Sequence, residues 1–273
     1  MSQSGRGDME REYLAPAPSG LRRALGRLLA LGGDYRTPEA HAAFRAAIAD
    51  QPPHAVCVSV GGGPQRVHPA LLNLNLGPYP NVDVAGTAYG LPFRDGSVDA
   101  VYCEAVLEHL ELPEQAVAEM FRVLRPGGQV FAATPFLQAF HGYPSHFQNY
   151  TLVGHRRLFE RAGFEVLSAG PCVGPVFAMT DLGANFLRRY LPGGKILSLA
   201  WRLAAVALRP LDLWFRKHPD AYVLASTTYV HARKPIQSQE APLGALAEAP
   251  VDPGSNGGLT PAPGSGAAAG TAR

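Results

Sequence analysis

The chain has 273 residues, enough for one main domain with additions, since domains usually contain roughly 100 to 200 residues. Its 24 lysines and arginines nearly balance 22 aspartates and glutamates, and a net charge of +2 without a basic stripe predicts no nucleic-acid partner. No uncharged apolar run reaches the roughly 18 residues that a transmembrane helix needs, and the Leu-rich stretch 21–31 is interrupted by arginines that exclude a signal peptide. The 3 scattered cysteines have no zinc-ligand spacing, so we expect reduced thiols in a cytoplasmic protein.

Both ends of the chain have compositions that bury little apolar surface. Residues 1–20 are polar and then Pro-rich, and residues 236–273 consist mainly of Ala, Pro, Gly and Ser. Such segments cannot offset the entropy lost on ordering. We therefore expect both ends to be disordered and residues 21–235 to form one domain.

Between these ends, strand and helix patterns alternate. The predicted helices are Thr37–Asp50, which opens with an N-cap threonine followed by proline, then Leu112–Leu124 and Thr151–Ala162. The predicted strands are Val56–Val60, Leu71–Leu76, Val82–Val84, Val98–Cys103, Gln129–Ala133, Phe164–Ser168 and Tyr222–Ala232. This alternation indicates a mostly parallel α/β sheet with helices on both faces, in which ligands bind at the carboxyl ends of the strands.

Residues 175–218 lie between the last two predicted strands and mix Leu and Trp with Arg and Lys. The pattern predicts a pair of amphipathic helices interrupted at Pro192–Gly194. We expect a cap over the substrate pocket. The alternative is a patch that lies on an anionic membrane surface.

Three sequence blocks follow the glycine turn Gly61–Gly63 in a fixed order. They are Leu91–Val101, Val106–His109 and Arg122–Gly128. In this order and spacing they closely resemble the small-molecule, methyltransferase type 11-like branch of the class I S-adenosylmethionine-dependent methyltransferases. The resemblance covers roughly residues 53–168, with residues 222–234 matching the final antiparallel strand of the family.

The resemblance implies a Rossmann-like fold with a seven-stranded sheet, and S-adenosylmethionine as the methyl donor. Its donor-binding positions fall on the glycine turn and on the ends of neighbouring strands. In this chain they are Ser59, Gly61, Gly63, Asn75 at the ribose position, Thr87 and Ala88 at the adenine position, and Glu104 near the donor's amino group.

Two features depart from the family pattern. Neutral residues, namely Ser59, Asn75 and Thr87, stand where the family usually has acids. Hydrogen bonds to charged groups contribute about 1.5 to 3 kcal/mol and neutral ones about 0.5 to 1.5 kcal/mol. Asn75 still offers a carbonyl oxygen, so we expect the ribose contact to be weakened rather than lost. In addition, the stretch 63–75 is short and contains Pro64 and Pro69, so we expect no long helix behind the donor's carboxylate. Either the donor is held differently, or it is held poorly.

The acceptor side is predicted in the loop Phe136–Thr151, which is dense in histidine and aromatic residues. Related methyltransferases often carry a His and a Pro-Asp-Tyr-Arg-Tyr-Thr-like run here. His141 or His146 is the candidate base, and Tyr143 and Tyr150 are candidate pocket walls. The alternative is that these side chains only order a long loop.

Glu104, Glu108 and His109 resemble a metal-binding Glu-x-x-Glu-His motif of some RNA-end methyltransferases, but the first spacing is one residue longer and Ala105 takes the matching place. We therefore expect no metal here and interpret Glu108 and His109 as capping the next helix.

Three functional hypotheses follow. The first is an active methyltransferase that modifies an oxygen or nitrogen of a small or lipid-linked acceptor. The second is a catalytically degenerate fold that acts as a binding or regulatory partner, motivated by the missing acids. The third, a nicotinamide-binding oxidoreductase, fits poorly because Arg66 stands where the Gly-x-Gly-x-x-Gly spacing needs glycine.

Overall fold

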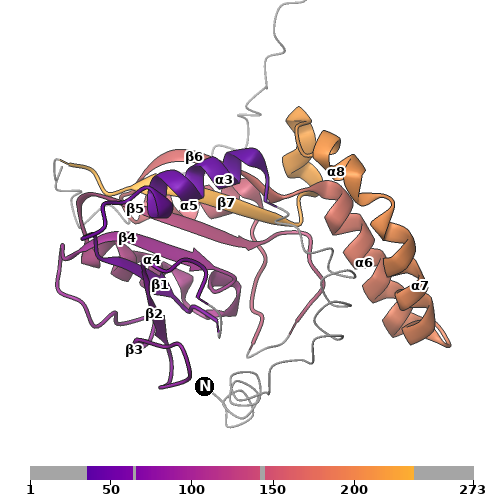
Figure 1. Cartoon of the computed structure of the whole chain (residues 1–273), viewed down its shortest axis with the longest axis horizontal. Coiled ribbons are helices and arrows are strands. Elements are labelled where there is room, and N and C mark those ends of the chain that lie inside the picture. The colour runs from indigo at the N-terminus through magenta and orange to yellow at the C-terminus, as the bar shows by residue number, and fades with distance from the viewer. Residues whose placement is uncertain (1–35, 64–65, 142–144, 237–273) are drawn as a thin grey trace, which may run out of the picture. The chain divides into compact units, whose positions relative to one another are not determined.

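The computed structural model describes residues 36–63, 66–141 and 145–236, so the predictions for residues 1–35 and 237–273 concern residues outside the described ranges. The described chain forms a seven-stranded sheet in the order β3-β2-β1-β4-β5-β7-β6, in which only β7 is antiparallel to its neighbours (Figure 1). The strands are β1 Cys57–Val60, β2 Leu71–Asn75, β3 Val84–Ala85, β4 Val98–Glu104, β5 Leu124–Pro135, β6 Glu165–Val173 and β7 Thr227–Arg233. The predicted α/β fold class is confirmed.

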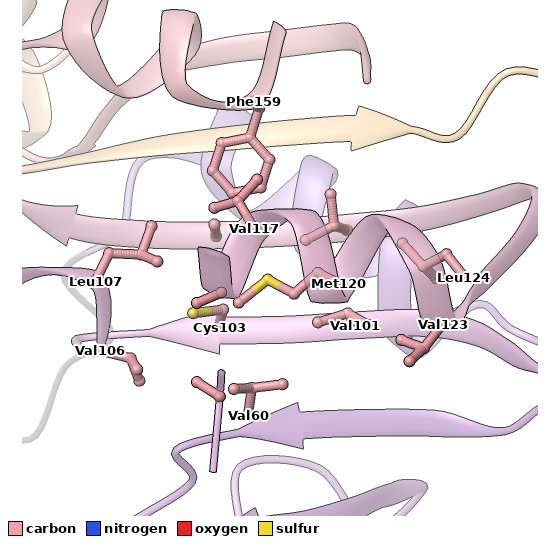
Figure 2. Packing of buried hydrophobic residues seen from close by; sticks show 14 of the residues in the cluster. Val60, Val101, Cys103, Val106, Leu107, Val117, Met120, Val123, Leu124 and Phe159 are labelled. Atoms are coloured by element: carbon pink, nitrogen blue, oxygen red, sulfur yellow. The ribbon is translucent and has the colours of Figure 1, made fainter. Parts of the chain in front are cut away.

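Helices cover both faces of this sheet. On one face lie α4 (Pro113–Val123) and α5 (Leu152–Arg161). Figure 2 shows Val101 and Cys103 of β4 against Val117 and Met120 of α4, with Phe159 of α5 beside them. These side chains are almost completely buried, and burying one such side chain contributes about 1.5 to 3 kcal/mol.

The opposite face is covered by α3 (Pro38–Phe44), which continues into the π-helical turn Arg45–Ala49. Its predicted N-cap is confirmed, since Thr37 Oγ1 accepts a hydrogen bond of 3.1 Å from Ala40 N. The Phe44 ring contacts Tyr102 and Phe131 edge to face, with centroid distances of 5.6 and 5.8 Å. These rings fix α3 on the sheet.

Three strand boundaries differ from the prediction by five residues each, and the others by at most two. Residues 219–224 form a 3-10 helix rather than the start of the last strand, because pairing with β5 begins only at Thr227, opposite Pro135. β5 begins at Leu124, directly after α4, because Leu124 pairs with Val98 of β4. β6 continues to Val173 because its pairing with β7 extends to Thr227.

The predicted helical insertion is confirmed, with one helix more than expected. It contains α6 (Pro175–Tyr190), α7 (Gly194–Val206) and α8 (Arg209–Phe215). The break falls at the predicted Pro-Gly-Gly, where Gly193 has a φ of +69°. α6 and α7 lie side by side (Figure 1) and are joined by a hydrogen bond of 2.8 Å from Trp201 Nε1 to Thr180 O. Among the described residues, no helix has both the length and the apolar character to cross a membrane.

Candidate functional site

The predicted donor-binding residues lie at one edge of the sheet. The strands β3, β2, β1 and β4 are adjacent and parallel, so their carboxyl ends meet at the same edge. Gly61 follows β1, Asn75 ends β2, Thr87 and Ala88 follow β3, and Glu104 ends β4. The structure therefore brings these residues to one edge, as expected of a donor site. Their individual roles stay predictions.

The glycine turn needs glycine at two of its three positions. Gly61 has a φ of +67°, and a Cβ there would lie 2.5 Å from Val106 Cγ2. A Cβ on Gly62 would collide with the side-chain oxygen of Asn73, whereas a Cβ on Gly63 would meet nothing within 4 Å. Gly62, which was not among the predicted site residues, is therefore more tightly constrained than Gly63.

Two buried amides brace this turn from β2. Asn75 Nδ2 donates to Gly62 O at 2.6 Å, and Asn75 Oδ1 accepts from Leu76 N at 2.7 Å. Asn73 Nδ2 donates to Gly63 O at 3.1 Å and to Asn81 O at 2.8 Å. A carboxylate at position 75 could not donate to Gly62. The departure from the family acid thus has a structural reason, namely that this turn is held by an amide donor.

The connection from β1 to β2 replaces the usual helix with a charged clamp. Residues 61–63 and 66–70 contain no helix, as predicted. Arg66 Nη2 donates to Asp83 Oδ1 at 2.8 Å, and Asp83 Oδ2 accepts from Asn73 N at 2.7 Å. The Arg66 guanidinium and the Asn73 N–H lower the pKa of Asp83. Ser59 is buried inside β1, next to this turn.

Glu104 directs its carboxylate to partners within the protein. Its Oε2 accepts from Arg36 Nη2 at 2.8 Å and from the Tyr102 hydroxyl. Burial, and then the Glu104 carboxylate, raise the pKa of Tyr102. The next residue, Ala105, has a φ of +54°, an uncommon conformation for a residue with a side chain. The predicted role of Glu104 near the donor's amino group stays a prediction.

On the acceptor side, the structure gathers Glu108, His109, His141 and His146, which we call the histidine cluster. Ring centroids are 5.2 Å apart for His109 and His141, and 4.3 Å apart for His141 and His146. The loop after β5 is fixed to the loop after β4 by two hydrogen bonds of 2.8 Å, from Phe147 N to Glu108 O and from Gln148 Nε2 to Leu110 O. His109 and Glu108 join the two predicted histidines.

The two candidate bases are not equivalent. His146 Nδ1 accepts from His141 N at 3.1 Å, so its Nε2 carries the proton that is donated to Asn149 Oδ1 at 2.6 Å. His141 Nδ1 lies 3.2 Å from Ala139 O, which can only accept, so the lone pair of His141 is on Nε2. His141 is therefore the better placed base. Burial raises the pKa of Tyr150, and Tyr143 lies outside the described residues.

Glu108 does not cap the next helix. Helix α4 begins after Leu112 without a side-chain cap, so the capping interpretation is wrong. Glu108 is instead buried below the histidines, where its Oε2 accepts from Thr134 Oγ1 at 3.1 Å. Burial raises the pKa of Glu108 to about 7. The sequence pattern had indicated only a helix-capping role for Glu108 and no role in a functional site.

A separate cavity of about 690 Å³ lies in the insertion rather than at the glycine turn. Its walls are almost entirely apolar and come from α6, α7, α8 and the 3-10 helix, among them Met179, Trp201, Leu211, Phe215 and Leu224. The insertion also exposes large apolar side chains on its surface, with Ile196 75%, Trp214 74% and Tyr190 73% exposed. Its three helices pack mainly against one another, so the predicted role as a cap stays a prediction.

Comparisons with known proteins agree with this fold. Residues 65–132 match the family model described as a methyltransferase domain. A Mycolicibacterium smegmatis protein named as an S-adenosylmethionine-dependent methyltransferase is 41% identical over 95 residues, which are 32% of this chain and 37% of that protein. The demethylmenaquinone methyltransferase of Renibacterium salmoninarum is 46% identical over 55 residues, 20% of this chain and 23% of that protein. The chain thus spans less than half the length of these curated relatives.

Two solved structures are similar to this chain at low sequence identity. The 1,6-didemethyltoxoflavin-N1-methyltransferase of Burkholderia thailandensis has a TM-score of 0.46 and 14% identity, covering 81% of this chain and 92% of its own. The [4+2]-cyclase SpnF has a TM-score of 0.48 and 17% identity, covering 86% of this chain and 97% of its own. The family match over residues 65–132 and the ordered motif blocks make this chain similar to methyltransferase domains, and the strand order of its sheet agrees with that similarity.

Proposed function

We propose that this chain transfers a methyl group from S-adenosylmethionine to an oxygen or nitrogen of a small or lipid-linked acceptor. The observation that carries the proposal is the methyltransferase-domain match over residues 65–132, which spans β2, β3, β4 and most of β5. The donor supplies an activated methyl group, so the protein mainly has to position the acceptor and exclude water.

The glycine turn fits S-adenosylmethionine, whereas the residue at the ribose position departs from the family pattern. The Gly61 turn provides a backbone free of side chains after β1, which suits a close approach by a ligand. The ribose position is occupied by Asn75, whose oxygen already accepts from Leu76 N. An acid at this position would accept from the ribose hydroxyls, whereas Asn75 offers an amide, so the ribose contact is where this site departs from the family pattern.

A nucleophile that carries a proton needs a proton acceptor nearby. The histidine cluster supplies this, with the Nε2 lone pair of His141 available and both ring nitrogens of His146 hydrogen bonded. Phe140 stacks on His146 at a centroid distance of 5.6 Å and helps to hold the loop in place. In this proposal His146 and Tyr150 position the loop, and His141 accepts the proton.

Calorimetric titration of the full chain with S-adenosylmethionine and S-adenosylhomocysteine tests the donor. We expect one-to-one binding of both. Absence of binding up to millimolar ligand would overturn the proposal and favour the second function, a degenerate fold that acts as a binding partner. The observation that favours this second function is the use of Asn75 to brace the glycine turn in place of an acid.

The insertion supports a lipid-linked acceptor. Its apolar cavity suits an acyl or isoprenoid chain, and its exposed apolar residues are flanked by the exposed cations Arg188, Arg189, Lys195 and Lys217. Apolar side chains combined with cations are typical of helices that lie on anionic membranes. We therefore propose peripheral contact with an anionic membrane through residues 175–218.

Vesicle co-sedimentation tests this contact. We expect binding to vesicles that contain phosphatidylglycerol and much weaker binding to pure phosphatidylcholine. The variants Ile196→Ser and Arg188→Glu should each weaken binding, whereas Val153→Ser and Arg94→Glu, at exposed sites outside the insertion, are the matched controls. Equal losses in both pairs, or equal binding to both vesicles, would contradict the proposed surface.

A further inference from the structure

Three side chains of the histidine cluster point ligand atoms at a common space. One potential ligand atom from each of Glu108, His109 and His141 lies within 4.8 Å of the other two. His109 Nε2 is 3.8 Å from Glu108 Oε1. Such distances leave room for an ion between the three groups, since metal–nitrogen and metal–oxygen bonds to zinc are about 2.0 to 2.2 Å long.

The two imidazoles are held in the orientation that metal ligation requires. His109 Nδ1 contacts Ser145 O, and His141 Nδ1 lies 3.2 Å from Ala139 O. A carbonyl oxygen only accepts, so both Nδ1 atoms carry a proton and both lone pairs are on Nε2. Histidine ligands are commonly fixed in this way, by donation of the second ring N–H to a backbone carbonyl.

The third ligand is a buried carboxylate with an unused oxygen. Glu108 is fully buried, and its Oε1 has no hydrogen-bond partner among the described residues, whereas Oε2 is bonded to Thr134. A buried unpartnered carboxylate oxygen is costly and needs an explanation. A cation in front of Oε1 would remove that cost.

We propose that Glu108, His109 and His141 bind a divalent transition-metal ion of the zinc type. Two imidazoles and one carboxylate are a ligand set for zinc or iron(II), and three protein ligands leave a position open to a further ligand. Magnesium prefers a shell of oxygen atoms, which two imidazoles do not provide. The sequence-based expectation of no metal is thus replaced by a proposal of one.

The binding itself does not depend on the proposed function, but its use does. If the chain is a methyltransferase, an acceptor oxygen at the open position would have its pKa lowered by the ion, and would lose its proton more readily. With the ion bound, His141 would be a metal ligand and the ion would promote deprotonation of the acceptor. Without the ion, His141 itself would accept the proton.

Titration of the full chain with Zn²⁺, without methyl donor, tests the site. We expect one ion per chain, and a visible absorption band of four-coordinate geometry when Co²⁺ is used instead. Glu108→Gln keeps the shape and the Thr134 contact, and His109→Ala and His141→Ala each remove one ligand. Each variant should lower Zn²⁺ affinity by more than about 100-fold, since loss of an outer-shell partner alone costs about 10- to 100-fold.

His54→Ala is the matched control, because His54 is exposed and lies outside the cluster. It should bind Zn²⁺ like the parent. Far-ultraviolet circular dichroism shows whether each variant is folded. If a variant is unfolded, the presence or absence of the four-coordinate Co²⁺ absorption band in the parent protein tests the site instead. Parent-like Zn²⁺ binding in folded Glu108→Gln and His141→Ala, or displacement of Zn²⁺ by an equal concentration of Mg²⁺, would overturn the proposal. Because no donor is present, failure here leaves the methyltransferase proposal standing.

Discussion

The sheet edge at the carboxyl ends of β1 to β4, which we call the donor edge, differs from the histidine cluster in the hydrogen bonds that its polar side chains make. At the donor edge, the amides of Asn73 and Asn75 donate to the carbonyls of the glycine turn, and the Glu104 carboxylate is taken by Arg36. In the histidine cluster, the backbone carbonyls hold Nδ1 of His109 and His141, which leaves the lone pair of each ring on Nε2. The polar side chains at the donor edge are thus hydrogen bonded within the protein, whereas the histidine cluster has ring nitrogens whose lone pairs can accept from or bind a ligand.

This difference gives a structural reason for the amide at position 75, where the family usually has an acid. An amide can donate and accept, so it can support a turn that no helix follows. Chemistry that requires a lone pair or a negative charge is therefore concentrated in the loops after β4 and β5. Three predictions test this contrast.

The largest expected effect is at the glycine turn. Gly61→Ala should lower the free energy of unfolding by about 2 to 4 kcal/mol, because it combines a positive φ with a contact to Val106. Gly63→Ala is the control and should change it by less than about 1 kcal/mol, since nothing lies within 4 Å of the new Cβ. Urea unfolding measures both. Similar losses in the two variants would show that the turn is not built as described.

Next in size is the acid sensitivity contributed by His155, on α5 beyond the acceptor loop. His155 is fully buried against Thr228 Oγ1 at 3.1 Å and the rings of Tyr150 and Phe159, and burial lowers its pKa to about 3. The unfolded chain binds a proton below about pH 6.5 while the folded chain does not. The stability contributed by neutral His155 is thus complete above about pH 6.5 and is lost as the pH falls toward 3.

The variant His155→Leu isolates this contribution. Between about pH 7 and about pH 5 the parent should lose about 2 kcal/mol more than the variant, at about 1.4 kcal/mol per pH unit. Chemical denaturation at the two pH values measures the difference. Equal losses in parent and variant would mean that His155 is protonated in the folded protein.

The last prediction concerns the ribose position, where the expected effect on donor binding is the smallest of the three. Asn75→Ala should weaken S-adenosylmethionine binding about tenfold, equivalent to about 1.4 kcal/mol. Asn75→Asp keeps an acceptor oxygen but cannot donate to Gly62 O, so it should lower stability by about 1 to 3 kcal/mol while retaining donor affinity. Calorimetry and thermal unfolding separate the two effects. Unchanged donor affinity in Asn75→Ala would remove this residue from the donor site.

Most of the fold was predictable because its signals are local. The apolar runs of β1, β2 and β4 and the Thr37 cap are confirmed to within one or two residues. The misplaced start of β7 was not readable from composition. Residues 222–224 have the same strand-forming composition as the residues that follow, and only the length of the partner strand β5 decides where pairing begins.

The candidate site was less predictable. The sequence pattern predicted His141, His146 and Asn75 as site residues. It did not predict their hydrogen-bond partners, which decide what each side chain can do. Asn73 lacked any local signal, because its importance comes from a turn ten or more residues earlier in the chain. Glu108 was given a capping role because sequence proximity to a helix was the only available cue, while its actual partner Thr134 is on β5.

The place where the insertion joins the sheet has an evolutionary consequence. Val173, the last residue of β6, is paired with Thr227 of β7, and Ser226 N donates to Val173 O at 3.0 Å. The two strands are thus already adjacent where α6–α8 leave and rejoin them, and a short turn would join them equally well. The length and sequence of the insertion can therefore change without disturbing the pairing of β6 with β7.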